Sequence, residues 1–83
     1  DSLAYGEDGV LPKETKELLG LVASLVLRCD DCVKYHLVEA RKAGNERKAI
    51  VEAMSIGLVV GVTIVIPHLR RAVEFLDDLE SGA

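Results

Sequence analysis

The 83-residue chain has little of what usually stabilises a small monomer. It contains no Trp, and its three aromatic residues are Tyr5, Tyr35 and Phe75, so the core must be aliphatic. Basic residues are fewer than acidic ones, and the net charge of -4 argues against a nucleic-acid partner, which would require a surplus of cations on one face. With 49% hydrophobic residues, the composition nevertheless argues for a folded chain.

Long apolar runs are also lacking. The longest nearly uncharged run, residues 53–67, has about 15 residues and includes Ser, Thr and two Gly. A helix needs about 20 apolar residues to cross a bilayer. No basic and apolar signal segment opens the chain. We therefore expect a cytoplasmic protein with no membrane partner.

The two cysteines supply little stability. Cys29 and Cys32 are three positions apart, and a disulfide between them closes a loop too small to restrain the unfolded chain much. For so short a chain, apolar burial minus the entropy of ordering comes out near zero. Residues 49–66 are meanwhile too apolar to have a solvent face. We therefore expect a homo-oligomer, in which other subunits cover this segment.

Hydrophobic periodicity predicts an all-α domain over residues 11–83, preceded by an arm or loop at residues 1–10. Four helices are expected, at about residues 11–28, 32–43, 46–60 and 63–79. Pro12 suits the first position of the first helix. Asp30 or Asp31 can cap the second helix, and Asn45 can cap the third.

The run Val59–Ile66 is ambiguous, because its β-branched residues favour a strand. A single strand without a partner strand is unstable, so the helical interpretation is preferred. If Thr63 caps the fourth helix, Pro67 falls near its first turn, where the missing N–H costs least.

The strongest chemical signal is the segment CDDCVKYH at residues 29–36. Two cysteines at a helix start can form a reversible disulfide, and a helix N-terminus favours the thiolate. His36 follows Cys32 by four residues, so it lies one turn along the same face and can accept the thiol proton. Asp30 and Asp31 oppose this, because negative neighbours disfavour a thiolate.

Two other interpretations of the cysteines remain open beside a redox pair. Both thiols could simply be buried and inert. Alternatively, they could contribute to a structural zinc site, whose ligands would be Cys29, Cys32, His36 and either His68 or Glu17. Redox chemistry is favoured, because an intracellular Cys-x-x-Cys pair is more often catalytic than structural.

Position alone favours a solvated Glu17, although its neighbours at helical spacing are small or apolar. If Glu17 were buried it would need a partner, and His36 on the next helix is available. His68 is expected on a helix surface or at an interface rather than as a ligand. Glu39 and Glu52 are expected to be solvated or at the edge of the packing.

The positions of Glu17, Cys29, Cys32 and His36 resemble the Glu…Cys-x-x-Cys-x-x-x-His signature of the carboxymuconolactone decarboxylase family, and within it the alkyl hydroperoxidase D branch. The flanking segments LPKETKELLGLVAS and HLVEARKAG resemble that family as well. The resemblance implies an all-helical fold whose subunits associate, often as trimers or hexamers. It also implies that Glu17 is a site residue.

By this resemblance, the chain is a peroxidase of small hydroperoxides. Cys32 attacks the peroxide and becomes a sulfenic acid, and Cys29 resolves it as a disulfide. Glu17 and His36 carry the proton away from Cys32. The resemblance implies no bound cofactor or metal; an external dithiol or thioredoxin-like reductant restores both thiols.

One position departs from the branch, which often has His before the second cysteine where this chain has Asp31. An anion there disfavours a thiolate, so general protein disulfide exchange is an alternative function. A non-enzymatic redox-sensing or scaffold subunit is another. Decarboxylation is not expected, because the decarboxylases of the family generally lack the cysteine pair.

Overall fold

The computed structural model describes residues 3–82 and forms four α-helices and one short 3-10 helix. The elements are α1 (Lys13–Val26), α2 (Asp30–Lys42), α3 (Arg47–Gly61), the 3-10 helix η1 (Val62–Val65) and α4 (Ile66–Ser81). No strand occurs among the described residues. The expected all-α fold is therefore confirmed.

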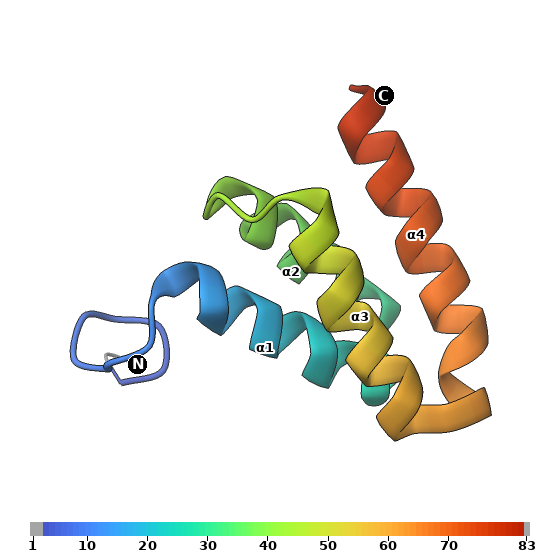
Figure 1. The fold of residues 1–83 in the computed structure, drawn as a ribbon, viewed down its shortest axis with the longest axis horizontal. Helices are drawn as coiled ribbons and strands as arrows, with labels where there is room; N and C mark the ends of the chain where they lie inside the picture. The colour runs from blue at the N-terminus through green and yellow to red at the C-terminus, as the bar shows by residue number, and fades with distance from the viewer. Residues whose placement is uncertain (1–2, 83) are drawn as a thin grey trace.

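The helices are arranged around α1 and α2. α1 lies against both α2 and α3, whereas α4 makes most of its contacts with α2. At η1 the chain turns sharply, so that α3 and α4 diverge from this corner (Figure 1). The arm before α1 forms an open loop of turns and bends at the other end of the molecule (Figure 1).

The core between these helices is aliphatic, as the composition requires. Its fully buried larger side chains come from all four α-helices and η1: Leu21, Leu25, Val33, Leu37, Ile50, Met54, Val65 and Leu76. Each such side chain contributes roughly 1.5–3 kcal/mol when removed from water. This core holds α1 and α2 side by side, which positions the cysteines and their neighbours.

The helix starts differ from the predicted ones. Pro12 precedes α1 as its N-cap instead of occupying the first helical position. α2 begins at Asp30, and its N-cap is Cys29, whose Sγ accepts a hydrogen bond from the Cys32 N–H at 3.3 Å. The prediction that Asp30 or Asp31 caps α2 is therefore wrong. The sulfur takes the capping position that oxygen-bearing side chains usually fill.

The predicted cap of α3 is also wrong, because its N-cap is Glu46 and no side chain caps it. Asn45 is buried instead, and its Nδ2 donates to the carbonyl oxygens of Glu14 at 2.9 Å and Ala40 at 3.2 Å. It thereby ties the start of α1 to the end of α2. A buried amide satisfied in this way costs little, whereas an unpaired one would be expensive.

The ambiguous run folds as the end of α3, η1 and the start of α4, so the helical interpretation is confirmed. Pro67 lies in the first turn of α4, as predicted. Thr63 does not cap α4, whose N-cap is Val65, because η1 occupies the residues between the two helices. Gly61 permits the tight corner, since a Cβ there would overlap the Val65 side chain.

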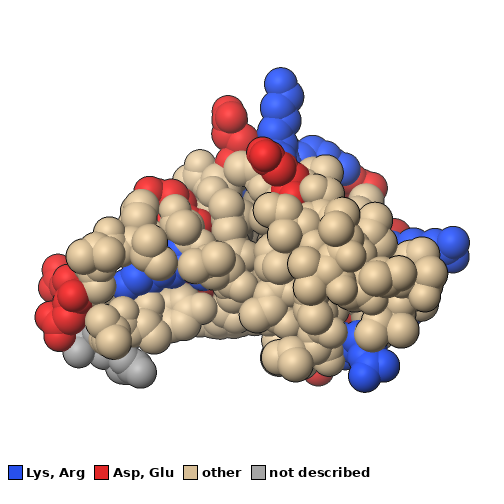
Figure 2. All heavy atoms as spheres, turned by 60° about the horizontal axis from the view of Figure 1, so that its bottom comes forward, with Lys and Arg blue, Asp and Glu red and all other residues tan. Residues whose placement is uncertain are grey.

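The corner formed by α3, η1 and α4 presents a broad apolar surface. Val59 is 77% exposed, and several neighbouring apolar side chains are also exposed: Ile56, Val60, Val62, Ile64 and Ile66. A shallow hollow of about 660 Å³ lies beside them, lined chiefly by Leu58, Ile66, Leu69 and Val73. Figure 2 brings this side forward and shows charged side chains mainly around its margins.

The stretch Arg47–Ser81, which joins α3, η1 and α4, is long and apolar enough to cross a membrane by length and composition. Its most apolar window is 28% buried within the chain. The apolar run of about 15 residues counted in the sequence is therefore shorter than the 18-residue apolar window found within this stretch. The stretch is not one straight rod, because it turns at η1 (Figure 1).

Candidate functional site

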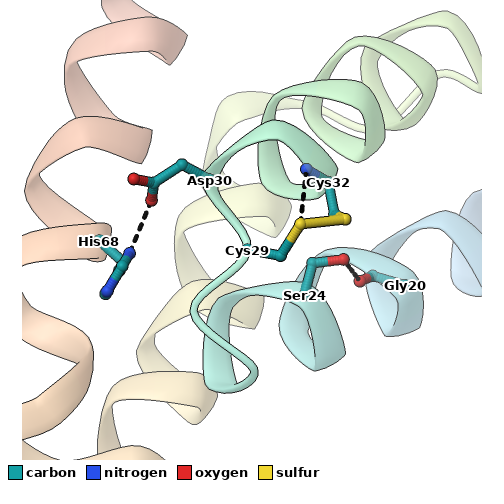
Figure 3. Close-up of a disulfide and its surroundings, with 6 residues drawn as sticks. All are labelled: Gly20, Ser24, Cys29, Asp30, Cys32 and His68. Atoms are coloured by element: carbon teal, nitrogen blue, oxygen red, sulfur yellow. Dashed lines mark hydrogen bonds and ion pairs between the residues drawn. A yellow bond between two sulfur atoms is a disulfide. The ribbon is translucent and has the colours of Figure 1, made fainter.

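The two cysteines lie at the junction of α1 and α2 and are joined by a disulfide (Figure 3). α1 ends in a Schellman motif, in which the Cys29 N–H donates to the Ser24 carbonyl and the Arg28 N–H donates to the Leu25 carbonyl, both at 3.1 Å. Arg28 occupies the left-handed position of this motif, with φ of 62°. The motif turns the chain so that Cys29 directly precedes the first turn of α2.

Within that turn the cysteines differ in position and exposure. Cys29 is half-buried and caps the helix, whereas Cys32 is exposed and occupies the third helical position. The free N–H groups of a first helical turn carry partial positive charge, which stabilises a thiolate. The two sulfurs therefore lie at the positively polarised end of the α2 dipole.

Asp30 does not leave its negative charge uncompensated beside the sulfurs. Its carboxylate lies 2.7 Å from His68 Nδ1 and accepts a 2.7 Å hydrogen bond from Arg71 Nε, and both partners lie on α4 (Figure 3 shows the His68 contact). The hydrogen bond to His68 lowers the pKa of Asp30, and Arg71 acts in the same direction. Asp31 is exposed and points to no such partner among the described residues.

Glu17 is buried, with only 2% of its surface exposed, so the solvated position favoured by local sequence alone is wrong. Its Oε1 lies 3.0 Å from His36 Nδ1, and its Oε2 accepts a hydrogen bond from Lys13 Nζ at 3.1 Å. A carboxylate removed from water needs such partners. The structure therefore brings together the acid of α1 and the imidazole of α2.

His36 is enclosed by residues that the sequence did not single out. Only 16% of its side chain is exposed. The Tyr5 ring stacks on it with centroids 6.4 Å apart, and the Tyr35 ring meets it edge-on at 5.1 Å. Gly20 lies against it, since a Cβ there would come within 2.6 Å of His36 Cε1. The sequence offered one signal for these tyrosines: the chain has few aromatic residues, so each of them is a candidate contact of the site.

The four predicted site residues thus form two pairs, Cys29 with Cys32 and Glu17 with His36. His36 follows Cys32 by one turn of α2. In this disulfide form, no hydrogen bond joins the imidazole to either sulfur among residues 3–82. Proton transfer between the two pairs remains a prediction.

The zinc alternative finds no support in this arrangement. The two sulfurs form a disulfide, Glu17 forms a hydrogen-bonded pair with His36, and His68 forms a hydrogen-bonded pair with Asp30. Within the described part of the chain, no three His, Cys, Asp or Glu side chains are grouped to hold a metal ion. Each residue proposed as a zinc ligand is therefore already paired with another side chain.

The all-α fold, the paired cysteines and the buried Glu17–His36 pair agree with the family resemblance of the sequence. The comparison with known families leads to the same class of protein. The model of the carboxymuconolactone decarboxylase family matches residues 1–75. The chain belongs to the carboxymuconolactone decarboxylase family.

Solved structures from Thermotoga maritima are similar to the chain. One is a crystal structure of a carboxymuconolactone decarboxylase family protein for which a role in the antioxidative response has been suggested; it is 62% identical, with a TM-score of 0.80, over 82% of this chain and 70% of that one. A second crystal structure of the same protein is 58% identical with a TM-score of 0.90, over 98% of this chain and 70% of that one.

Curated relatives are more distant. An uncharacterised protein of the cox locus of Paracoccus denitrificans is 29% identical over 90% of this chain and 68% of its own length. An uncharacterised protein of Cupriavidus necator is 28% identical over 94% of this chain and 69% of its own length.

Proposed function

We propose that this protein is a thiol-dependent peroxidase that reduces small hydroperoxides through Cys29 and Cys32. The observation that carries the proposal is a disulfide at the first turn of α2, one helical turn before an imidazole held by a buried carboxylate. The antioxidative role suggested for the protein of Thermotoga maritima is consistent with it. A Cys-x-x-Cys pair needs no metal or organic cofactor for this chemistry.

The proposed cycle begins with the reduced pair. The Cys32 thiolate attacks one peroxide oxygen, the O–O bond breaks, and the other oxygen takes a proton and leaves as an alcohol or water. Cys32 is then a sulfenic acid, oxidised by two electrons. The Cys29 thiol then attacks the Cys32 sulfur, the S–O bond breaks, the hydroxyl group leaves as water with the proton from Cys29, and the disulfide forms. A dithiol or thioredoxin-like protein returns two electrons and two protons and so restores both thiols.

In this cycle, His36 transfers protons and Glu17 holds His36 in position. His36 accepts the Cys32 proton, directly or through a water, and returns it to the leaving oxygen. The Glu17 carboxylate on Nδ1 fixes the ring and stabilises the imidazolium that forms. Because Glu17 is buried, its charge acts on the imidazole with little screening by water.

The proposal extends to assembly and location. The exposed apolar corner of α3, η1 and α4 supports a homo-oligomer in which other subunits cover this corner. The family resemblance suggests a trimer or hexamer, and we propose a cytoplasmic location. Covering apolar surface stabilises an assembly by roughly 25 cal/mol for each Å² removed from water.

Two alternatives use the same disulfide differently. In a general protein disulfide oxidoreductase, the pair exchanges with disulfides of other proteins; the exposed Asp31 beside Cys32 favours this alternative, because its charge disfavours the thiolate that attacks peroxide. In a redox-sensing or scaffold subunit, the disulfide only stabilises the α1–α2 junction. Titration of the thiols in graded redox buffers separates the scaffold, whose disulfide should be very hard to reduce.

The test of the peroxidase is consumption of hydrogen peroxide in the presence of a dithiol, followed by mass spectrometry of both cysteines. Cys32→Ser should abolish turnover. Cys29→Ser should allow one turnover and then accumulate the Cys32 sulfenic acid, with the capping position retained because Ser is a good N-cap. Undiminished consumption by Cys32→Ser would exclude Cys32 as the nucleophile.

A further inference from the structure

The N-terminal arm places an aromatic ring on the imidazole of the site. The chain has three aromatic residues, and two of them, Tyr5 and Tyr35, contact His36. Tyr35 is one position before His36 on the same helix, whereas Tyr5 reaches it from the arm that precedes α1. The interplanar angle of 23° makes the Tyr5 contact a stack, one of the arrangements that aromatic pairs prefer.

The α1 surface is shaped to admit this stack. A Cβ at Gly20 would lie 2.8 Å from the Tyr5 hydroxyl oxygen and 2.8 Å from His36 Nδ1. Any other residue at this position would push the arm or the imidazole away. Gly20 is one turn after Glu17 on α1, so the acid that holds the imidazole and the gap that admits the tyrosine lie on one face.

The arm is also anchored independently of His36. Lys16 Nζ donates to the backbone carbonyls of Leu3 and Gly6, at 3.3 Å each. Gly9 allows the lysine this close approach, because a Cβ there would come within 2.9 Å of Nζ. One ammonium group on α1 therefore fixes the backbone on both sides of Tyr5.

We propose that Tyr5 is a positioning residue for His36: its ring covers the imidazole and, together with Glu17 on Nδ1, fixes the orientation in which His36 serves Cys32. Its importance for catalysis rests on the proposed function, whereas the stack itself does not. The aromatic ring carries this role, because no hydrogen bond from the Tyr5 hydroxyl is present among residues 3–82. Burial, followed by the charge of Glu17, raises the pKa of Tyr5, so the phenol stays neutral at pH 7 and is no base.

The test compares three variants in the full chain, all with Cys29→Ser so that Cys32 is the single thiol. Tyr5→Leu removes the ring, Tyr5→Phe keeps it, and Lys16→Met releases the arm without touching His36. Lys48→Met, an exposed lysine on α3, is the matched control for the lost charge. The readouts are the alkylation rate of Cys32 by iodoacetamide and the NMR shift of the His36 Cε1 proton, which senses the ring current of Tyr5.

Tyr5→Leu should slow alkylation at neutral pH by about tenfold and lose the ring-current shift, since misplacing a positioned group is costly. Lys16→Met should change both readouts in the same direction, and Lys48→Met should change neither. Tyr5→Phe should keep both the alkylation rate and the ring-current shift seen with Tyr5, which would not be the result if the hydroxyl were required. Wild-type alkylation by Tyr5→Leu, or a Phe variant as slow as the Leu variant, would overturn the inference.

Alkylation does not depend on peroxide chemistry, so the two proposals fail separately. A wild-type protein that consumes no peroxide, yet shows the predicted differences in alkylation, would reject the peroxidase and support the role of Tyr5. Far-ultraviolet circular dichroism of every variant checks that the helices are intact.

Discussion

The α1–α2 half and the α3–η1–α4 half of the molecule differ in how their polar and apolar side chains are accommodated. In the α1–α2 half, even the buried acid Glu17 has its partners within the chain, and the arm covers the imidazole beside it. Both halves expose large apolar side chains, but in the α3–η1–α4 half six of them fall within the short stretch from Ile56 to Ile66, whereas those of the other half, such as Leu19 and Leu27, are scattered along the sequence. This difference fits our proposal that the chemistry lies within one chain and that other subunits cover the apolar corner.

The largest effect is expected from truncating the core that joins the two halves. Leu25 is fully buried and lies against Gly57 of α3. Leu25→Ala should lower the free energy of unfolding by about 2–5 kcal/mol, measured by urea denaturation, because it leaves a cavity. Leu27→Ala is the matched control: Leu27 is 76% exposed, so a change within about 0.5 kcal/mol is expected. Equal losses at the two positions would contradict this description of the core.

The next largest effect is expected in the α1–α2 half, at the Glu17–His36 pair. Glu17→Gln keeps the shape of the side chain but removes the charge that stabilises the imidazolium, so peroxide reduction should slow by about 100-fold, a usual size for general acid–base effects. Glu52→Gln removes an exposed acid from α3 and should have no such effect. If Glu17→Gln reacted at the wild-type rate, the Glu17–His36 pair would be structural and unconnected to the sulfurs.

A smaller effect is expected at the exposed apolar corner of the α3–η1–α4 half. Ile64→Ser, at the exposed corner, should weaken self-association by about tenfold, because burying an Ile side chain contributes roughly 1.5–3 kcal/mol. Light scattering over a range of protein concentrations measures this. Val10→Ser, in the exposed arm, should leave association unchanged. A wild-type protein that remains a monomer at all concentrations would show that no second copy covers the corner.

The smallest effect is expected where the two halves meet through Asp30, His68 and Arg71. Because its pKa is lowered in the folded state, Asp30 contributes stability above its unfolded pKa of about 3.9, and this is lost as the pH falls through the folded value. Asp30→Asn should therefore be less stable than wild type at neutral pH, and the difference should shrink near pH 3. Urea denaturation across this range tests it, with the exposed Asp31→Asn as control.

Local sequence predicted much of this fold because helical periodicity and chain-breaking residues act over a few positions. The second helix, expected to end near residue 43, ends at Lys42 and is followed by Gly44 with a φ of 101°, and Pro67 lies in a first helical turn as expected. The spacing of the cysteines likewise predicted that they could pair within one turn, and they do.

The contacts that shape the site were less predictable, because they join distant positions. Glu17 and His36 are 19 residues apart, and Asp30 and His68 are 38 apart. Whether an acid on an amphipathic helix is buried depends on which helix packs there, and local pattern does not specify this. The Tyr5 contact was missed for the same reason, since the arm has no periodicity that places it on α2.

Cys29 combines two roles in one atom, because its sulfur both caps a helix and forms half of a disulfide. A substitution at this position can consequently affect both. A serine would keep the helix start and lose the electron chemistry, whereas an alanine would lose both. A disulfide built into a helix cap needs no dedicated loop, which suits so short a polypeptide.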